Sequence, residues 1–518
     1  MQLRSSQYGS DEHQDNNTAQ SNIVMVSQTP QLPPPNSISN GSTTTPPQTP
    51  SHYVEPLSET VKNYFVAYPL FLLIIWGAFY VFWDEAALPG GAVYTIIVLE
   101  VCAYVLGEIV AKSDLPPQLG MLMAGLILGN IPYSFISEDL YQLVILQLRW
   151  LAIVVSVTKG ALGIFPGIIW KFRKVIPPLA IAPYFAEAII WYLGSYYVAG
   201  HSSSASFFIA GLYSTMSGIL LFPYVDNLEK EIHPKSSDLS SETKQLSPHA
   251  LEILFVAKKT MGLDAVLGIL FAKSALGFMF ADDFQSGLIK GPGEVVFGAG
   301  LGILWGGLSG LLLTGHKHVV LRVITVILGG TVTFIGMRKL GYPRGTHVGV
   351  LIGAFTAISI WRSNKKKVVG LEKIIDTNDK IWALLEPFLF AIIGARINVM
   401  AINWSMFGLG FCVWAACTLV RLVTVFWSTQ WSGWTLRERL FIVTAWSGKG
   451  TLQAAIGPVP IETALLNHLN SDVVESMRRV MELAVLILIF SHIFGYVGVK
   501  LWGKKLLSKE DENSAVVV

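Results

Sequence analysis

The sequence predicts an all-α polytopic membrane protein with about fourteen transmembrane helices. Its composition is the first reason: 52% of the 518 residues are apolar and 14% are charged, with a mean hydropathy of +0.51. Soluble domains carry about 25% charged residues. The second reason is that the apolar residues gather in runs, near the length of about 20 residues that a helix needs to cross a bilayer. The formal net charge of +2 does not indicate a nucleic-acid partner, because Lys and Arg lie in the loops between these runs.

Residues 1–57 are predicted to form a disordered polar tail. The segment is rich in Gln, Ser, Thr, Asn and Pro, so it cannot bury a hydrophobic core. It lacks the charged start and apolar centre of a cleavable signal peptide. The three cysteines, Cys102, Cys412 and Cys417, lie in apolar runs and show neither a disulfide framework nor metal-ligand spacing. No metal, cofactor or enzymatic activity is expected, since the sequence also lacks a nucleophile elbow and a phosphate loop.

Fourteen apolar spans follow within residues 58–502, and residues 503–518 are expected to form a cytoplasmic C-terminal tail. The expected spans are 64–83, 91–111, 118–131, 144–165, 175–199, 205–225, 261–280, 295–315, 319–337, 346–361, 381–402, 405–427, 440–459 and 480–502. The spans 118–131 and 346–361 are short for a bilayer crossing. The glycine-rich run LGILWGGLSG lies inside the span 295–315, where close helix packing is the usual reason for glycine.

The basic residues predict which side of the membrane each loop faces. An even number of spans puts both termini on one side, and Lys and Arg concentrate in cytoplasmic loops. With cytoplasmic termini, the inside loops contain the basic clusters at 171–174 and 362–367. Arg338, Lys339 and Arg344 then fall outside, against this bias. We expect a multi-pass protein of the plasma membrane or an organelle membrane, with both termini in the cytoplasm.

A weak internal symmetry relates the spans. If 58–90 contains an added helix and 294–315 is a linker helix, the remaining spans form two sets of six, 91–280 and 319–502. An odd number of crossings separates the two sets, so they have opposite orientations. Inverted repeats of this kind are typical of secondary transporters, whose substrate sites lie near the membrane centre on broken helices.

The fifth span of each set carries helix breakers in its middle. The first contains the Ser-Gly pair at 217–218 and then Pro223. The second contains SGKG at 447–450 and then the Gly-Pro pair at 457–458. Glycine weakens a helix through its conformational freedom, and proline removes a hydrogen-bond donor. We therefore expect both spans to be broken helices.

The span 261–280 carries a carboxylate, Asp264, at bilayer depth. A charge in that position costs about 2.5–3.5 kcal/mol on insertion scales, and more by other estimates. One interpretation is an acid near the membrane surface, or one neutralised by a neighbouring helix. The other is an ion or proton pathway.

Other charges also lie within or near the spans. They are Glu187, Arg421, Lys449, Lys159 and Arg396, with Glu100, Glu108, Glu386 and Glu482 in similar positions. Each should pair with another charge or face water. Structural ion pairs explain any one of them as well as transport does, but together within an inverted repeat they favour transport. Asp282 and Asp283 lie in a hydrophilic loop, ADDFQSGLIKGPGE, and are excluded as solvated.

Four segments of the chain resemble one family. They are LPPQLGMLMAGLILGNIP at 115–132, VTKGALGI at 157–164, EPFLFAIIGA at 386–395 and AWSGKGTLQAAIG at 445–457. These segments are similar to those of the sodium/proton antiporters of the cation:proton antiporter superfamily, specifically its animal NHA branch. The similarity runs from about residue 90 to residue 502 and keeps the order of the motifs.

The resemblance implies an antiporter-type fold with two crossing broken helices beside an ion-binding helix. It also implies a homodimer whose protomers each have a dimerisation domain and a mobile six-helix core. A monovalent cation and a proton would compete for one carboxylate, here Asp264. Glu187 and Lys449 match the branch's membrane-buried acid–base pair, and Arg421 matches the cation of the helix before the second broken one. The implied partners are monovalent ions, protons and the lipid bilayer.

Three positions depart from the family pattern. The paired Asp-Asp of the ion-binding helix reads Asp264-Ala265, so Ala265 stands at the position of the principal ion-binding carboxylate. The first broken helix has Ser217-Gly218 where the branch has Ser-Pro. Arg396 stands where the branch has an acid.

These departures change what the site can bind. A monovalent cation needs oxygen ligands and compensating negative charge, and a nearby opposite charge such as Arg421 favours the ionised form of Asp264. Together these two residues carry no net charge. Cation binding would then need oxygens from Ser217, Thr215, Glu187 or backbone carbonyls at a helix break.

Three functions remain open at this point. The first is a proton-coupled monovalent cation antiporter, Na⁺/H⁺-like with an altered ion site, of the kind that serves pH homeostasis. The second is proton-linked anion transport, such as that of chloride, which the missing acid and the additional Arg396 favour. The third is a membrane regulator or scaffold that has lost transport.

Overall fold

The structure is a computed structural model and describes residues 66–113, 115–131, 144–216, 249–313, 319–363, 371–401 and 404–508. Within these residues the secondary structure is helical, and no strand occurs in them. Contacts divide the chain into two units, Met1–Pro69 and Leu70–Val518. Everything described below concerns the second unit.

The described residues form α-helices of 5 to 37 residues. They are α2 (Tyr68–Trp83), α3 (Ala92–Lys112), α4 (Pro117–Gly129), α6 (Leu146–Leu162), α7 (Pro166–Lys171), α8 (Ile176–Leu193), α9 (Ser203–Tyr213), α11 (Ala250–Met279), α12 (Phe284–Leu288), α13 (Glu294–Leu312), α14 (Val319–Lys339), α15 (Thr346–Ser363), α16 (Leu371–Ala395), α17 (Trp404–Ser428), α18 (Leu436–Ala445), α19 (Thr451–Ile456), α20 (Val459–Leu466) and α21 (Ser471–Leu507). Short helical turns are η2 (Asp84–Ala87), η4 (Gly194–Val198), η6 (Ile289–Gly293) and η7 (Val399–Ala401).

A helix overlaps each of the fourteen predicted spans, so the prediction of an all-α membrane protein is confirmed. By length and composition, seven helices in the described ranges can cross a membrane: Pro69–Ala87, Ala92–Lys112, Ile176–Val198, Phe284–Leu312, Val319–Lys339, Phe407–Ser428 and Ser471–Leu507. Shorter apolar helices occupy Pro117–Gly129, Ser203–Tyr213 and Leu452–Leu466. The total of fourteen crossings stays a prediction.

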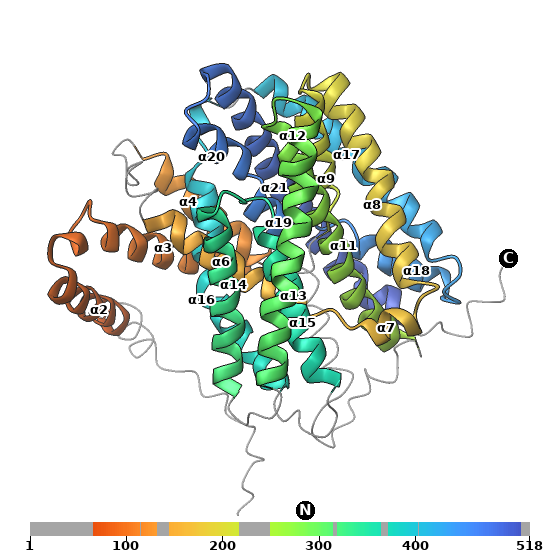
Figure 1. Cartoon of the computed structure of the whole chain (residues 1–518), viewed down its shortest axis with the longest axis horizontal. Helices are drawn as coiled ribbons and strands as arrows, with labels where there is room; N and C mark the ends of the chain where they lie inside the picture. Colours follow the sequence, from red (N-terminus) through yellow and green to blue (C-terminus); the bar gives the residue numbers. More distant parts are fainter. Residues whose placement is uncertain are drawn as a thin grey trace, which may run out of the picture. The chain divides into compact units, whose positions relative to one another are not determined.

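The helices of the second unit pack as two groups (Figure 1). The first group consists of α3, α4, α6, α14, α15 and α16, and its members pack mainly on one another. The second consists of α8, α9, α11 and α17 to α21. Contacts between the groups are sparser and run through α11 and α19, which touch α6, α15 and α16. Below, these are called the scaffold group and the core group.

Helix α13, the predicted linker helix, packs along α15 of the scaffold group. The two helices approach so closely that a Cβ added at Gly298 would lie 2.2 Å from the carbonyl oxygen of Gly345, and one at Gly306 would lie 2.2 Å from that of Gly353. Only glycine leaves room for this backbone contact. The glycine-rich run of the sequence therefore serves helix packing, as expected.

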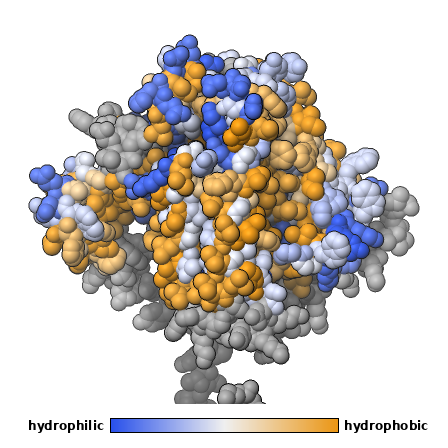
Figure 2. All heavy atoms as spheres, viewed as in Figure 1, coloured by the Kyte–Doolittle hydropathy of each residue, from blue (hydrophilic) through white to orange (hydrophobic). Residues whose placement is uncertain are grey.

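The outward faces of α13 and α14 are apolar. Ile303, Leu304 and Leu308 of α13 are more than half exposed, as are Leu328 and Val332 of α14. Figure 2 shows apolar side chains gathered over the region that α13, α14 and α15 occupy in Figure 1. Exposed apolar side chains on this scale suit contact with lipid acyl chains.

The second predicted broken helix has its break, and the first ends at its expected break, beyond which the chain lies outside the described residues. Helix α9 ends at Tyr213, and Ser214 to Met216 are not helical. In the second, α18 ends at Ala445 and α19 begins at Thr451, so residues 446–450 form the break. The breakers Ser217, Gly218 and Pro223 lie outside the described residues. The Gly-Pro pair at 457–458 separates α19 from α20, as proline inside a helical run should.

Candidate ion-binding site

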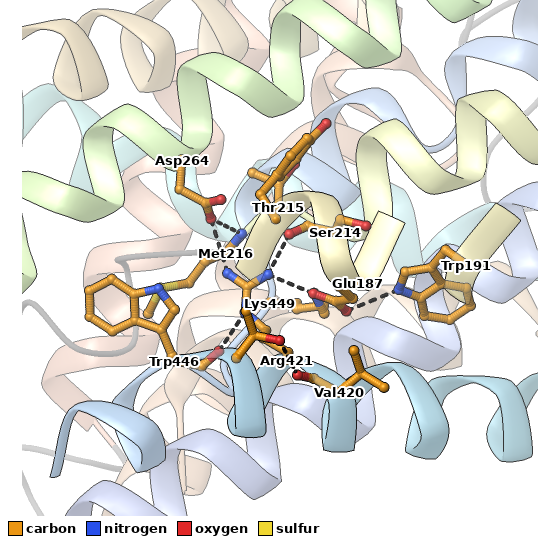
Figure 3. A network of polar contacts seen from close by, with 12 residues as sticks. Glu187, Trp191, Ser214, Thr215, Met216, Asp264, Val420, Arg421, Trp446 and Lys449 are labelled. Carbon is orange, nitrogen blue, oxygen red and sulfur yellow. Dashed lines mark hydrogen bonds and ion pairs between the residues drawn. The ribbon is translucent and has the colours of Figure 1, made fainter. Parts of the chain in front are cut away.

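Four charged side chains from different helices meet beside the two breaks (Figure 3). Asp264 comes from the middle of α11, Arg421 from α17 and Glu187 from α8, while Lys449 lies in the break between α18 and α19. Asp264 and Glu187 are 0% exposed, and Arg421 and Lys449 are 1% exposed. The site is thus closed to solvent on every side, and we call these four residues the Asp264 cluster.

Arg421 is the centre of the Asp264 cluster. Its Nη1 donates to Glu187 Oε2 at 2.6 Å and to the carbonyl oxygen of Ser214 at 2.5 Å. Its Nη2 donates to Asp264 Oδ2 at 3.2 Å, and its Nε donates to the carbonyl oxygen of Trp446 at 2.9 Å. The guanidinium therefore joins both acids to both helix breaks. Its planar fork of five donors is suited to such shared contacts.

Glu187 is held by three donors. Lys449 Nζ lies 2.7 Å from Oε1 and 2.9 Å from Oε2. Trp191, one turn further along α8, donates from Nε1 to Oε1 at 3.0 Å. With the bond from Arg421, both carboxylate oxygens are fully engaged. A buried carboxylate with this many charged and neutral donors is a fixed counter-ion.

Asp264 is held less tightly. Its Oδ2 accepts the backbone N–H of Met216 at 2.5 Å and the longer bond from Arg421. Its Oδ1 is buried and accepts no hydrogen bond. Of the four carboxylate oxygens in the Asp264 cluster, Oδ1 is the one left open. A buried acceptor without a partner costs about 1–3 kcal/mol, so Oδ1 is a candidate ligand position.

One amide ties the two breaks together. Gln453 of α19 donates from Nε2 to the carbonyl oxygens of Leu212, at 3.0 Å, and Thr215, at 2.8 Å. Its Oε1 accepts the N–H of Gly450 at 2.9 Å. Helix ends leave backbone groups unsatisfied, and buried ends need such partners. Gln453 thereby satisfies both breaks and holds them side by side.

Hydroxyl oxygens line the first break near α11. Thr215 is buried, and its Oγ1 donates to the carbonyl oxygen of Gly211 at 3.4 Å. Ser214 is also buried, and its Oγ has no hydrogen-bond partner. A Cβ added at Gly268 of α11 would lie 1.9 Å from Thr215 Oγ1, so only glycine lets α11 pack here. The break presents oxygens beside the helix that carries Asp264.

The structure brings together most of the predicted site residues. Asp264, Glu187, Arg421 and Lys449 form one network, and Thr215 lies in the break beside it. Ser217 lies outside the described residues. The neighbouring Ala265 of α11 is half-buried and offers no oxygen from its side chain. The interpretation of Asp264 as an acid neutralised by a neighbouring helix therefore holds in part, since Arg421 pairs with it.

Arg396 lies in another place. It follows α16 and lines a cavity of about 810 Å³ between the ends of α4 and α16 and helices α20 and α21. Asn130, His468 and Arg478 line the same cavity. None of the contacts of the Asp264 cluster involves Arg396. Its expected role as a supporting charge of the ion site stays a prediction.

Two other charged residues considered in the sequence analysis, Lys159 and Asp283, lie outside the Asp264 cluster. Lys159 pairs with Asp379 at 3.0 Å in a half-exposed ion pair. Asp283 caps α12 by accepting the N–H of Ser286 at 2.9 Å, which agrees with its exclusion as a site residue. Sequence reasoning missed Ser214 and Gln453. For Gln453 a signal was present, because it stands within the segment AWSGKGTLQAAIG.

A second group of buried charges lies on the opposite face of α11. We call it the Lys273 cluster, and it consists of Arg149, Lys273, Glu294, Arg338, Arg344, His347 and Glu462. Lys273 follows Asp264 by nine residues, about two and a half turns, and so points the other way. It is 1% exposed and electrostatically influenced by Arg149, Arg338 and Arg344.

The Lys273 cluster has more positive than negative charge. Arg344 pairs with Glu294 at 2.8 Å, and Arg149 pairs with Glu462, which links α6 of the scaffold group to α20 of the core group. Arg338 stacks on Trp150 at 4.3 Å from the ring centroid. Among the described residues Lys273 has no ion pair. Four basic residues therefore face two acids in this cluster.

The fold and the site together define a class of protein. Two interrupted helices that meet at their breaks, around a buried carboxylate, form the core of an ion-transporting membrane protein of the antiporter type. The family described as "Sodium/hydrogen exchanger, transmembrane" matches residues 96–503, and the chain belongs to this family.

Similar proteins agree with the family. The chain is 25% identical over 451 residues to "Sodium/hydrogen exchanger 9B2" of Homo sapiens, covering 86% of this chain and 80% of that protein. It is 24% identical over 472 residues to "Sodium/hydrogen exchanger 9B1" of Homo sapiens, covering 88% and 86%. The expected resemblance to the animal NHA branch is thus confirmed.

A solved structure shares the fold. The sodium proton antiporter MjNhaP1 from Methanocaldococcus jannaschii superimposes with a TM-score of 0.61 at 15% sequence identity. The match covers 80% of this chain and 97% of that chain. At this identity the likeness concerns the fold alone, and it confirms the expected antiporter-type fold.

Proposed function

We propose that the protein exchanges a monovalent cation for a proton across a membrane, with Asp264 as the group for which the two compete. The observation that carries the proposal is the open oxygen Oδ1 of Asp264, buried beside two helix breaks in a member of the exchanger family. A carboxylate that is already saturated, such as Glu187, has no position left for a cation.

The contacts of Arg421 support cation entry at Asp264. Its bond to Asp264 is the longest of its four, at 3.2 Å, whereas the bonds to Glu187 and to Ser214 O are 2.6 and 2.5 Å. Arg421 can therefore release Asp264 and keep its other partners. A bound cation would find Asp264 Oδ1, Ser214 Oγ and Thr215 Oγ1, the hard oxygen ligands that alkali cations need.

Proton binding is the alternative occupancy of the same carboxylate. Glu187, Arg421 and Lys449 stay paired in either state, so the charge that changes belongs to Asp264 alone. One carboxylate then exchanges one cation for one proton, and the net charge of the occupied site is the same in both states. Alternating access of the core group relative to the scaffold group would present this site to each side in turn.

The Lys273 cluster supports a second candidate function, proton-linked anion transport. Its four basic residues and two acids leave surplus positive charge in the interface between the core and scaffold groups. The Asp264 cluster has two acids and two bases and so gives no surplus negative charge for a cation. Uptake of labelled chloride that responds to an imposed pH gradient would favour this function.

We further propose the topology and assembly. The basic loops support cytoplasmic termini, and the resemblance to the NHA branch supports a homodimer. The plasma membrane and organelle membranes remain equal candidates. Selective labelling of a single cysteine placed at position 510, in sealed vesicles, would test the topology, and native mass spectrometry in detergent would test the dimer.

Ion flux in proteoliposomes tests the proposed exchange. Gradients of Na⁺, Li⁺, K⁺ or Cl⁻ are imposed separately, and the internal pH is followed with an entrapped dye. We expect a cation gradient to move protons in the wild type and not in Asp264→Asn. Asp282→Asn is the matched control, because Asp282 is an exposed acid outside the site. A wild type that moves no protons with any cation would contradict the exchange and leave the non-transporting hypothesis.

A further inference from the structure

A groove opens on the outer side of the core group, away from both charge clusters. Its volume is about 860 Å³, and its walls come from α8, α9, α11 and α12. The lining is mostly aromatic and aliphatic, with Phe185, Ile189, Phe207 and Phe271 among its members, and none of the described residues that line it is charged. Pockets of about 300–1,000 Å³ with apolar walls and few polar groups are typical ligand sites.

The walls of the groove are rigid and its floor is made of small residues. Phe185 and Phe271 pack edge to face with ring centroids 5.3 Å apart, and Phe271 also contacts Tyr184 at 5.8 Å. Ala188 of α8 and Gly211 of α9 are among the small residues of the lining, and Gly211 lets α9 approach α11, where an added Cβ would lie 3.0 Å from the backbone nitrogen of Ala272. Rigid aromatic walls hold a ligand at low entropic cost, because few side-chain rotations are lost.

The surroundings indicate what fills the groove. Helix α8 belongs to a segment, Ile176–Val198, that can span a membrane, and Ile189 on the groove is 58% exposed. Hydroxyl groups gather at one end, where Tyr192 and Ser203 share a hydrogen bond of 2.9 Å beside Ser204, while the Tyr184 hydroxyl is bound to the carbonyl oxygen of Gly211. An apolar channel that opens to the bilayer and has hydroxyls at one end matches a lipid acyl chain with its ester region at the hydroxyls.

Helix α11 connects the groove with the candidate ion site. Phe271 and Phe278 follow Asp264 at seven-residue spacing, about two turns each, so all three lie on one face of α11. Tyr184 donates to the carbonyl oxygen of Gly211 at 2.8 Å, in the last turn of α9 before the break. Tyr184 is also within electrostatic reach of Asp264. A ligand in the groove would therefore press on the turn that positions Ser214, Thr215 and Met216.

We propose that this groove binds one acyl chain of a membrane lipid and that the bound chain stabilises the first helix break. The binding is independent of the proposed exchange, whereas its effect on transport rests on that proposed function. A lipid chain beside α9 restricts the motion of the break, so an empty groove lowers the rate of exchange.

Photolabelling tests the binding. The full-length protein is reconstituted with a phosphatidylcholine that carries a diazirine in one acyl chain, irradiated, and mapped by peptide mass spectrometry. We expect adducts on the α8 and α9 segments that line the groove. Ala188→Phe fills the floor, and Ser204→Phe narrows the opening from α9, so both variants should lose these adducts.

The control is Ala182→Phe, the same substitution on the same helix at an exposed position outside the groove. It should keep the adducts. Absence of adducts from the groove, adducts that survive both filling variants, or labelling by a sterol probe in place of the phospholipid would overturn the proposal.

Proton flux in the same liposomes tests the effect of the bound chain on transport. If Ala188→Phe loses the adducts but exchanges ions at the wild-type rate, the proposed link between lipid binding and transport is refuted. A wild type that keeps its adducts but moves no protons would refute the exchange alone.

Discussion

Helix α11 carries one buried charged residue on each of two faces, and the charged groups around these two residues differ. Asp264 faces a cluster with two acids and two bases, in which every charge has an opposite partner. Lys273 belongs to a cluster with four bases, itself included, and two acids, and it has no ion pair among the described residues. Burial alone therefore does not identify an ion site. We propose the Asp264 cluster as the ion site because it lies at two helix breaks and has one open oxygen.

The two clusters also connect different parts of the molecule. The Asp264 cluster joins members of the core group only, through α8, α11, α17 and the second break. The Lys273 cluster spans the interface between core and scaffold, since Arg149 of α6 bonds Glu462 of α20. Paired charges inside one group can move with it as a unit. Charges across an interface must separate if the groups move.

The largest loss of stability and activity should come from replacing Glu187, the acid that Arg421 and Lys449 share in the Asp264 cluster. Glu187→Gln leaves both Arg421 and Lys449 buried with one acid between them. Breaking a buried ion pair costs about 3–5 kcal/mol, so the unfolding temperature of the purified protein should fall strongly and exchange should stop. Adding Lys449→Met to Glu187→Gln restores charge balance and should recover much of the stability. Equal loss in single and double variants would show that the charges are not coupled.

Replacing lysine by methionine should change the stability of the fold in opposite directions in the two clusters. Lys449→Met removes a paired cation and should destabilise the fold by about 3–5 kcal/mol. Lys273→Met removes a buried cation that lacks an ion pair, and should stabilise the fold by about 1–3 kcal/mol, since burying an ion costs several kcal/mol. Thermal unfolding in detergent measures both. Destabilisation by Lys273→Met would mean that its charge is neutralised, for example by a bound anion.

A smaller effect, on cation affinity, is expected from adding an acid to the Asp264 cluster. Ala265→Asp gives α11 a second carboxylate beside Asp264, and one more negative charge within about 6 Å attracts a cation by roughly 2–3 kcal/mol at an effective dielectric constant of about 20. Part of this is lost to desolvation, so we expect about tenfold tighter cation activation, or about 1.4 kcal/mol. The half-activating Na⁺ concentration in the flux assay measures it. An unchanged value would place the cation away from Asp264.

The smallest change in stability should come from breaking an ion pair that lies outside both clusters. Lys159 and Asp379 lie 3.0 Å apart with side chains 31% and 43% exposed. Pairs with this exposure contribute about 0–1 kcal/mol, so Lys159→Ala should change the unfolding temperature little. It serves as the reference for the cluster variants. A loss as large as that of Lys449→Met would mean that this pair lies in lipid rather than in water.

Local properties of the sequence predicted much of the fold. Hydropathy located the spans, because a helix that crosses lipid must be apolar along its own length. The breakers at 447–450 located the second helix break, since glycine acts on the backbone of its own segment. Asp264 was recognised as a site residue because a carboxylate in an apolar run is costly wherever the other helices lie.

The partners of Asp264 could only be decided by the tertiary structure. Arg421 is 157 residues away from Asp264, and Lys449 is 262 residues away from Glu187, so no local pattern pairs them. The family resemblance nominated these residues, but the packing of α8, α11 and α17 made them one network. In the same packing, Arg396 lines a separate cavity and Gln453 contacts both breaks. Hydropathy acts residue by residue along the chain, whereas an ion pair forms only at contact distance, and contact distance is a property of the packed helices.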